Sequence, residues 1–257
     1  MIKRSESFGA VAKQYQKYRS SYDLRTYKLL ASLLGGKNKK YKILDIGCGT
    51  GKSTEPLVKV FKNAEIIGCD PDAAMLAEAR LRAKKLKLPI KYMEGRAEKI
   101  PFTDNYFDAV IAGTALHWFG TKKAVKEIRR VLKPGGLFFV FWRFFKEAGS
   151  INWLKIRRKY IIKSIARKFK DNPRRLKKLF QQSGFAKGKI SIIPFKERKT
   201  VAEEIGAIKT NAAYMMLPDK RRKDYLEEIT REYKKIQGNR KFITDQREIF
   251  IYYGFKK

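Results

Sequence analysis

Three glycines at alternate positions follow a short apolar segment near the start of the chain. Gly47, Gly49 and Gly51 come directly after 41–46, which is apolar and β-branched enough to form a buried parallel strand. Residues 52–61 then have the pattern of a helix, so the glycines lie at a strand-to-helix turn. Because glycine has no side chain, main-chain N–H groups there can approach a bound molecule closely. The pattern predicts a site for a nucleotide-like molecule.

The glycine spacing and a downstream acid indicate the kind of nucleotide. A dinucleotide fingerprint is Gly-x-Gly-x-x-Gly, and this chain has Lys52 where the third glycine of that fingerprint belongs. A second apolar segment, 65–69, ends in Asp70, roughly twenty residues after the loop, where a carboxylate can accept hydrogen bonds from both hydroxyls of a ribose. The pattern therefore favours a molecule with an unmodified ribose over a phosphorylated one.

Further motifs follow at intervals along the first half of the chain. They are Leu44–Gly51 (LDIGCGTG), Gly68–Pro71 (GCDP) with Met75 and Leu76, Gly95–Phe102 (GRAEKIPF), Phe107–Val110 (FDAV) and Leu132–Gly136 (LKPGG). In this order they resemble the class I S-adenosylmethionine-dependent methyltransferases, and within them the type 11 family. The segment 115–119 is similar to a subgroup that includes trans-aconitate-type methyltransferases. The resemblance implies a Rossmann-like α/β fold, with a doubly wound, mainly parallel seven-stranded sheet, an antiparallel last strand and helical cap elements.

The same resemblance implies S-adenosyl-L-methionine as the cofactor and assigns roles to residues of the motifs. Asp45 and the glycine loop would hold the methionine part, Asp70 the ribose, and Met75 would flank the adenine. Arg96 stands where many relatives carry an acid, so the main chain of Ala97 is the expected adenine contact. No metal site is expected. The full set expected to bind the cofactor is Tyr15, Arg19, Asp45, Gly47, Cys48, Gly49, Thr50, Gly51, Asp70, Pro71, Met75, Arg96, Ala97, Glu98, Gly113 and Thr114.

His117 is the only histidine and the candidate catalytic residue. It follows the predicted fourth strand, at the sheet edge where such folds place substrates. An ordinary histidine pKa near 6.5 would let it take a proton from a hydroxyl or amine acceptor, or it could form a pocket wall with Trp118. Methyl transfer from a sulfonium is an in-line displacement, and a carboxylate or soft nucleophile needs no base. Tyr18, His117 and Trp118 form the expected acceptor pocket; Tyr15, Tyr18 and Arg19 resemble a helix that closes over the cofactor, or pack onto the domain.

Chain length and composition limit the protein class. The 257 residues suit one α/β domain with an insertion. We expect 1–37 to form N-terminal cap helices, 38–143 the cofactor-binding core, 144–246 a basic helical insertion with a strand at 189–195, and 247–257 the closing strand. Two cysteines give no disulfide framework, and no apolar run has transmembrane length, so a cytoplasmic protein is expected.

The net charge of +35 is not explained by the resemblance. Sixty Lys and Arg face 25 Asp and Glu, whereas thermophilic adaptation adds lysine and glutamate together. The excess is concentrated in 151–200, with seventeen basic residues against two acids, and 153–169 has the pattern of a basic amphipathic helix. A polyanionic partner or a lysine-rich host proteome would account for it.

Four functions are compatible with these observations. The first is methyl transfer to a small molecule. If this acceptor is anionic, the positive electrostatic field of the protein would steer it into the site. The second is RNA methylation, with 151–200 tracking phosphates and Trp153, Tyr160 and Phe169 stacking on bases; the Gly113–Leu116 segment disfavours a planar exocyclic amine. The third is an interfacial enzyme acting on lipid at an anionic membrane surface. The fourth is a non-catalytic cofactor-binding scaffold.

Overall fold

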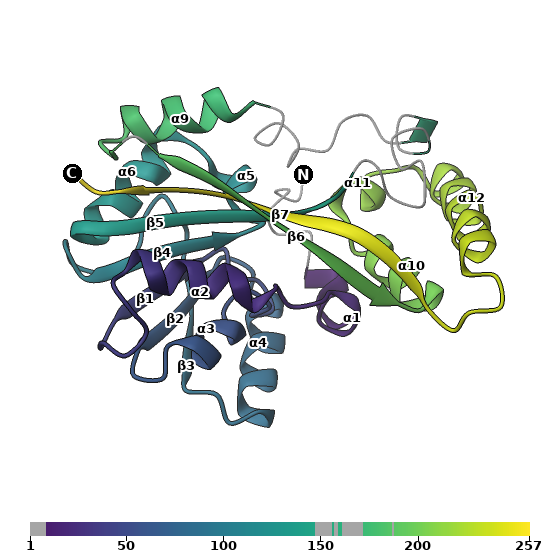
Figure 1. The fold of residues 1–257 in the computed structure, drawn as a ribbon, viewed down its shortest axis with the longest axis horizontal. Helices are drawn as coiled ribbons and strands as arrows, with labels where there is room; N and C mark the ends of the chain where they lie inside the picture. The colour runs from purple at the N-terminus through teal and green to yellow at the C-terminus, as the bar shows by residue number, and fades with distance from the viewer. Residues whose placement is uncertain (1–8, 147–155, 157–158, 161–171, 187) are drawn as a thin grey trace.

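The computed structural model describes residues 9–146, 156, 159–160, 172–186 and 188–257, and these form one seven-stranded sheet flanked by helices (Figure 1). The strand order is β3-β2-β1-β4-β5-β7-β6. Neighbours from β3 to β5 are parallel, while β7 is antiparallel to both β5 and β6, as expected from the sequence. The strands are β1 Lys42–Ile46, β2 Glu65–Asp70, β3 Ile90–Glu94, β4 Phe107–Gly113, β5 Leu132–Phe145, β6 Lys189–Lys199 and β7 Ile243–Phe255.

Helices cover both faces of the sheet. Side chains alternate along β1, so that Ile43 packs with Tyr27 of α2 while Leu44 packs in a separate cluster with Ile128 of α6. Burial on both faces explains why the central strands are almost continuously apolar. The described helices are η1 Gly9–Val11, α1 Ala12–Tyr18, α2 Leu24–Leu33, α3 Glu55–Val60, α4 Ala73–Lys85, α5 Leu116–Phe119, α6 Lys122–Val131, α9 Pro173–Gln182, α10 Val201–Lys209, α11 Ala212–Met215 and α12 Asp219–Gln237.

The strand order reverses between β1 and β4. From β1 the chain proceeds outward through β2 to β3, and it then returns to β4 on the other side of β1. A crevice at the carboxyl ends of the strands is expected at such a reversal. The glycine loop follows β1, Asp70 ends β2 and Gly113 ends β4, so all three motifs meet there.

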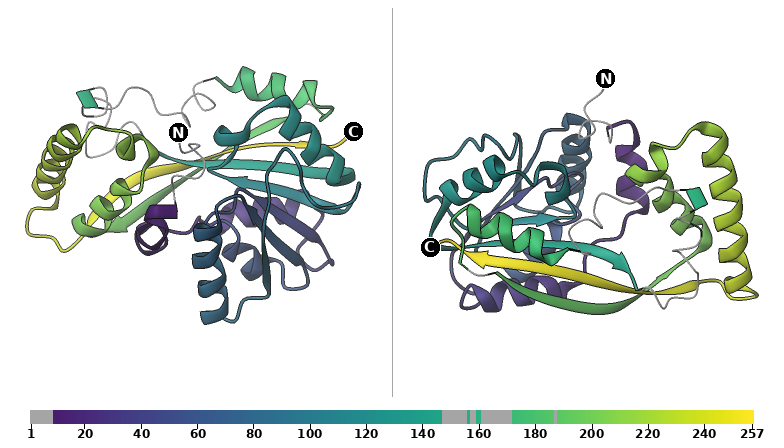
Figure 2. Two further views of the ribbon diagram at one scale, coloured as in Figure 1. Left: turned by 180° about the vertical axis from the view of Figure 1, so that it is seen from behind. Right: turned by 90° about the horizontal axis from the view of Figure 1, so that it is seen from above.

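A long ribbon of β6 and β7 extends past the main sheet toward α10, α11 and α12 (Figures 1 and 2). A third apolar cluster lies there, built by residues of α10 and α12, Ile243 of β7 and two residues from the 156–160 region. The region formed by α10, α11, α12 and the adjoining ends of β6 and β7 is called the cap below. Helix α1 contacts both α4 and α10, so it connects the cap to the rest of the sheet (Figure 2). The strand predicted at 189–195 continues to Lys199, and the closing strand begins at Ile243 rather than at 247.

Most of the basic helix predicted at 153–169 lies outside the described residues. Ile156, Lys159 and Tyr160 are helical, and both Ile156 and Tyr160 are buried in the cap cluster. The Tyr160 hydroxyl donates a hydrogen bond to Glu228 of α12 at 2.7 Å. Tyr160 is therefore used for packing and is not available to stack on a base. None of the helices in the described part of the chain is long and apolar enough to cross a membrane.

Candidate functional site

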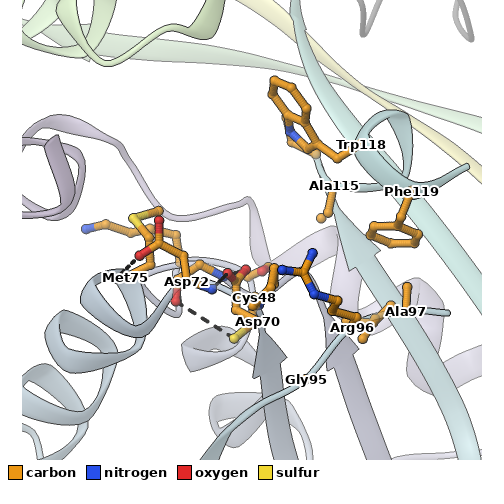
Figure 3. A pocket seen from close by; sticks show the side chains of 18 of the residues that line it. Cys48, Asp70, Asp72, Met75, Gly95, Arg96, Ala97, Ala115, Trp118 and Phe119 are labelled. Atoms are coloured by element: carbon orange, nitrogen blue, oxygen red, sulfur yellow. Dashed lines mark hydrogen bonds between the residues drawn. The ribbon is translucent and has the colours of Figure 1, made fainter. Parts of the chain in front are cut away.

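An open cavity, about 970 Å³ including the solvent space at its mouth, lies at the carboxyl ends of β1, β2 and β4. Figure 3 shows Trp118 on one side of it, across from Asp70, Asp72 and Met75. The lining residues are Tyr15, Tyr22, Ile46, Gly47, Cys48, Gly49, Lys52, Ser53, Asp70, Pro71, Asp72, Met75, Gly95, Arg96, Ala97, Glu98, Gly113, Thr114, Ala115, Trp118 and Phe119.

The glycine loop is shaped by backbone geometry that other residues adopt rarely. Gly47 and Gly49 have φ angles of +73° and +54°. A Cβ atom on Gly47 would lie 2.7 Å from the Cβ of Ala115, so this position has no room for a side chain. The loop is fixed to β2 because the Gly47 N–H donates to the Cys69 carbonyl at 2.7 Å.

Asp70 joins the glycine loop to the end of β2. One carboxylate oxygen accepts the Gly49 N–H at 2.8 Å and the other accepts the Asp72 N–H at 2.9 Å. Each oxygen keeps capacity for a further donor from the cavity. Burial raises the pKa of Asp70 to about 6, although the two N–H donors oppose that shift.

Asp72 is a site residue that the sequence analysis missed. Its Oδ1 accepts the N–H groups of Ala74 and Met75 and so caps the first turn of α4. Its Oδ2 is buried, lies on a residue that lines the cavity, and has no hydrogen-bond partner among the described residues. The available signal in the sequence is an acid immediately before a helix, two residues after Asp70.

Asp45 lies beneath the cavity rather than in its wall. It is fully buried, and its Oδ2 accepts the hydroxyls of Ser53 at 2.6 Å and Thr54 at 2.7 Å. Burial raises its pKa to about 6. These contacts tie β1 to the segment that leads into α3, and Oδ1 has no partner in the described chain. Thr50 and Gly51 also lie outside the lining, so a cofactor contact by Asp45 or by either of these two stays a prediction.

Of the three residues expected on the N-terminal helix, only Tyr15 lines the cavity. Tyr18 packs against α10, where a Cβ on Gly206 would lie 2.5 Å from the Tyr18 ring. Arg19 donates through Nε to the Thr210 hydroxyl at 2.9 Å, with its guanidinium 5.2 Å from the Tyr15 ring centre. Tyr18 and Arg19 thus attach the helix to the cap.

Tyr22 was not predicted, and it closes the cavity beside β4. Its hydroxyl donates to the Thr114 hydroxyl at 2.7 Å, and its ring meets Phe141 edge to face. Burial raises the pKa of Tyr22, so it stays a neutral donor. Because Tyr22 and Thr114 are far apart in the sequence, only the fold brings them together.

His117 lies behind Trp118 and is not part of the cavity lining. The indole N–H of Trp142 donates to its Nδ1 at 3.3 Å. A neutral imidazole has one acceptor nitrogen, so this bond places the proton on Nε2 and leaves no nitrogen free to accept a substrate proton. Burial lowers the pKa of His117 to about 4. The arrangement favours a role in positioning Trp118, and proton transfer by His117 stays a prediction.

Replacing His117 with glutamine should remove a pH-dependent part of the stability. The pKa of His117 is about 4 in the fold and near 6.5 in the unfolded chain, so the unfolded chain binds more protons in this window. The free energy of unfolding of the wild type should therefore fall by up to about 2 kcal/mol, relative to the variant, between pH 6.5 and 4.5. Urea denaturation of both proteins across this range measures the difference.

Comparing the variant with the wild type also cancels the opposite pH dependence of stability that two buried carboxyl groups contribute. Asp45 and Asp70 have pKa values raised to about 6, so they favour the folded state as the pH falls, equally in wild type and variant. A difference between the two proteins that stays constant with pH would contradict a buried neutral imidazole.

Comparisons with known proteins place this chain among methyltransferases. A family model described as "Methyltransferase domain" matches residues 44–140. An uncharacterised methyltransferase-like protein of Schizosaccharomyces pombe is 30% identical over 204 residues, which are 76% of this chain and 75% of that protein. An uncharacterised methyltransferase of Mycobacterium tuberculosis is 32% identical over 151 residues, which are 59% of this chain but 57% of the relative's length.

A solved structure shares the fold at low sequence identity. The phosphoethanolamine N-methyltransferase 2 of Haemonchus contortus, in complex with phosphomonomethylethanolamine and S-adenosylhomocysteine, has a TM-score of 0.59. It is 18% identical, and the superposition covers 99% of this chain and 59% of that one. At this identity the likeness concerns the fold.

Proposed function

This chain belongs to the class I S-adenosylmethionine-dependent methyltransferases of the type 11 family, and we propose that it methylates a small-molecule acceptor, using S-adenosyl-L-methionine as donor. The observation that carries the proposal is the convergence of the glycine loop, Asp70 and Asp72, the 95–98 segment and Trp118 around one cavity. The described residues alone thus offer backbone, acidic and aromatic groups to one ligand.

The cavity fits an adenosine-containing donor on its own geometry. Gly47 and Gly49 line the cavity without side chains, so a ligand can approach their main chain. The Asp70 carboxylate can accept from ribose hydroxyls, while Met75 and Ala97 would flank the adenine. The donor would supply an electrophilic methyl group on a sulfonium.

The protein's own contribution is to bind, align and exclude water. The aromatic side chains of Tyr15, Tyr22, Trp118 and Phe119 give the cavity apolar walls. Such walls orient an acceptor for in-line displacement and keep water away from it. With His117 held by Trp142, an acceptor that needs no base, such as a carboxylate, suits the site best.

The aromatic walls support a small acceptor over a polymer. An RNA substrate would need an open basic groove with exposed rings, and Tyr160, one of the rings considered for that role, is buried. The polyanion role expected for 151–200 stays a prediction, because 151–155, 157–158 and 161–171 lie outside the described residues.

The test is transfer of labelled methyl groups from S-adenosyl-L-methionine into fractionated cell extract. Label in the low-molecular-weight fraction, dependent on the enzyme, is the expected result. Label in RNA or lipid would replace the small-molecule proposal by one of the alternatives. Binding of S-adenosylhomocysteine without transfer to any fraction would point to a non-catalytic scaffold.

A further inference from the structure

Lys52 lines the cavity and directly follows the glycine loop. Lys52 is half-buried. Its ammonium group has no hydrogen bond or ion pair within the described part of the chain. A partly buried charge without a partner is costly, because it loses water and gains no counter-ion. The ammonium group of Lys52 therefore lacks a counter-ion, and an anion bound in the cavity would supply one.

Glu55, the acid whose charge acts on Lys52, already pairs with another residue. The Glu55 carboxylate pairs with Arg82 of α4 at 2.5 Å. Burial and the positive charge of Arg82 lower the pKa of Lys52 to about 8, while Glu55 opposes this shift less strongly. Arg82 thus takes the local counter-ion and at the same time adds to the positive field at Lys52.

The cations of β5 and β6 that also act on Lys52 have partners of their own. Arg143 of β5 pairs with Glu197 at 3.3 Å, and Lys199 of β6 pairs with Glu204 at 3.3 Å. Both lower the pKa of Lys52 through repulsion. Their charges are balanced within the cap, so Lys52 is the member of this group left for a ligand.

Arg19 cannot take this anion in the observed arrangement. The resemblance implied that Arg19 contacts the cofactor, yet its side chain donates to Thr210 and lies outside the cavity lining. Arg96 does line the cavity, on the 95–98 segment (Figure 3). Lys52 is therefore the cavity-lining cation that directly follows the loop expected to hold the methionine part.

We propose that Lys52 is the counter-ion for a carboxylate of a molecule bound in this cavity. The proposal rests on the proposed function, which supplies two such carboxylates: the amino-acid end of the donor and an acidic acceptor. The same ammonium–carboxylate pair would form in either case. Whether the carboxylate belongs to the donor or to the acceptor, Lys52 would favour a ligand that carries this negative charge over one that lacks it.

Calorimetry on the Lys52→Met variant separates the two sources. The probes are S-adenosylhomocysteine and 5′-methylthioadenosine, which share the adenosine part but differ in the amino-acid end. If the donor carboxylate is the partner, affinity for S-adenosylhomocysteine falls by roughly 10- to 100-fold while that for 5′-methylthioadenosine is unchanged. If the acceptor carboxylate is the partner, both affinities stay, and with S-adenosylhomocysteine at saturation the wild type binds citrate or benzoate more tightly than the variant does.

Two further variants control for folding and for bulk charge. Lys52→Arg should retain most of the affinity, and Lys59→Met, which removes an exposed charge from α3, should behave as the wild type. Affinity of the wild type for the carboxylate should also decline as the pH rises through about 8, since the ammonium is lost, with no matching decline in Lys52→Met.

The same measurements test the role of Lys52 and the binding of the donor separately. If Lys52→Met binds both nucleosides and both carboxylates as the wild type does, the counter-ion role is overturned while the donor assignment stands. If the wild type binds neither S-adenosylhomocysteine nor 5′-methylthioadenosine, the proposed function itself fails.

Discussion

Replacing Asp70 with asparagine should weaken the binding of S-adenosylhomocysteine by roughly 100-fold or more. Two ribose hydroxyls would lose a charged acceptor, and hydrogen bonds to charged groups contribute about 1.5–3 kcal/mol each. The asparagine amide also places an NH₂ group against the N–H of Gly49 or Asp72, which the carboxylate now accepts at 2.8 and 2.9 Å. Isothermal calorimetry measures the loss.

The ligand pair used for Lys52 gives Asp70 a different signature. Because the ribose is common to both molecules, Asp70→Asn should weaken 5′-methylthioadenosine as strongly as S-adenosylhomocysteine. In the wild type both affinities should decline below about pH 6, where the Asp70 carboxyl gains a proton. Asp104→Asn is the matched control, since the Asp104 side chain is 69% exposed and pairs with Arg130 at the surface. Equal affinity of Asp70→Asn and Asp104→Asn would remove the ribose assignment.

Local patterns predicted the strand at 41–46, the glycine loop and Asp70, while the seven-stranded sheet was implied by the resemblance of the ordered motifs. Strand 41–46, the glycines and Asp70 are short-range signals, because each reflects backbone geometry or burial at its own position. The fold then brings them together at the reversal between β1 and β4, as the order of elements implied. The residues of the glycine loop and of 95–98 that line the cavity were likewise recognised from short motifs at their own positions.

Contacts between distant segments could not be predicted in the same way. Arg19 meets Thr210 across 191 positions, and Trp142 of β5 donates to the acceptor nitrogen of His117 in α5. Each residue type was recognised as chemically capable, but its partner decides what it does. Lys52 is the converse case: it looked like a departure from the dinucleotide fingerprint, and only the turn after β1 shows that it faces the cavity.

The ends of β6 and β7 were missed for a physical reason. Strand prediction relies on apolar alternation, and the inward positions near the cap are charged: Glu197 and Lys199 on β6, and Asp245 and Arg247 on β7. These residues read as a solvated surface in the sequence. Their burial depends on mutual pairing, which no local pattern reports.

This buried network is the source of the second large effect, the loss of stability expected for Arg247→Met. The Arg247 side chain is 7% exposed and pairs with Glu197 at 2.7 Å, Glu204 at 2.8 Å and Asp245 at 3.2 Å. Its removal leaves three buried carboxylates with two cations, and breaking such a pair typically costs about 3–5 kcal/mol. Chemical denaturation should show this loss, and the melting temperature should fall by about 10 °C.

Two comparisons separate the network from a general effect of lost charge. Lys91→Met breaks a surface pair whose lysine is 77% exposed, so its cost should stay below about 1 kcal/mol. Adding Glu204→Gln to Arg247→Met should recover part of the stability, because it removes one carboxylate that has lost its counter-ion. The deficit of Arg247→Met should also narrow as the pH falls toward 5, since the orphaned carboxylates then take up protons in the folded state. A cost no larger than that of Lys91→Met would mean that desolvation cancels the attraction in this network, and the cap would then depend on its apolar cluster alone.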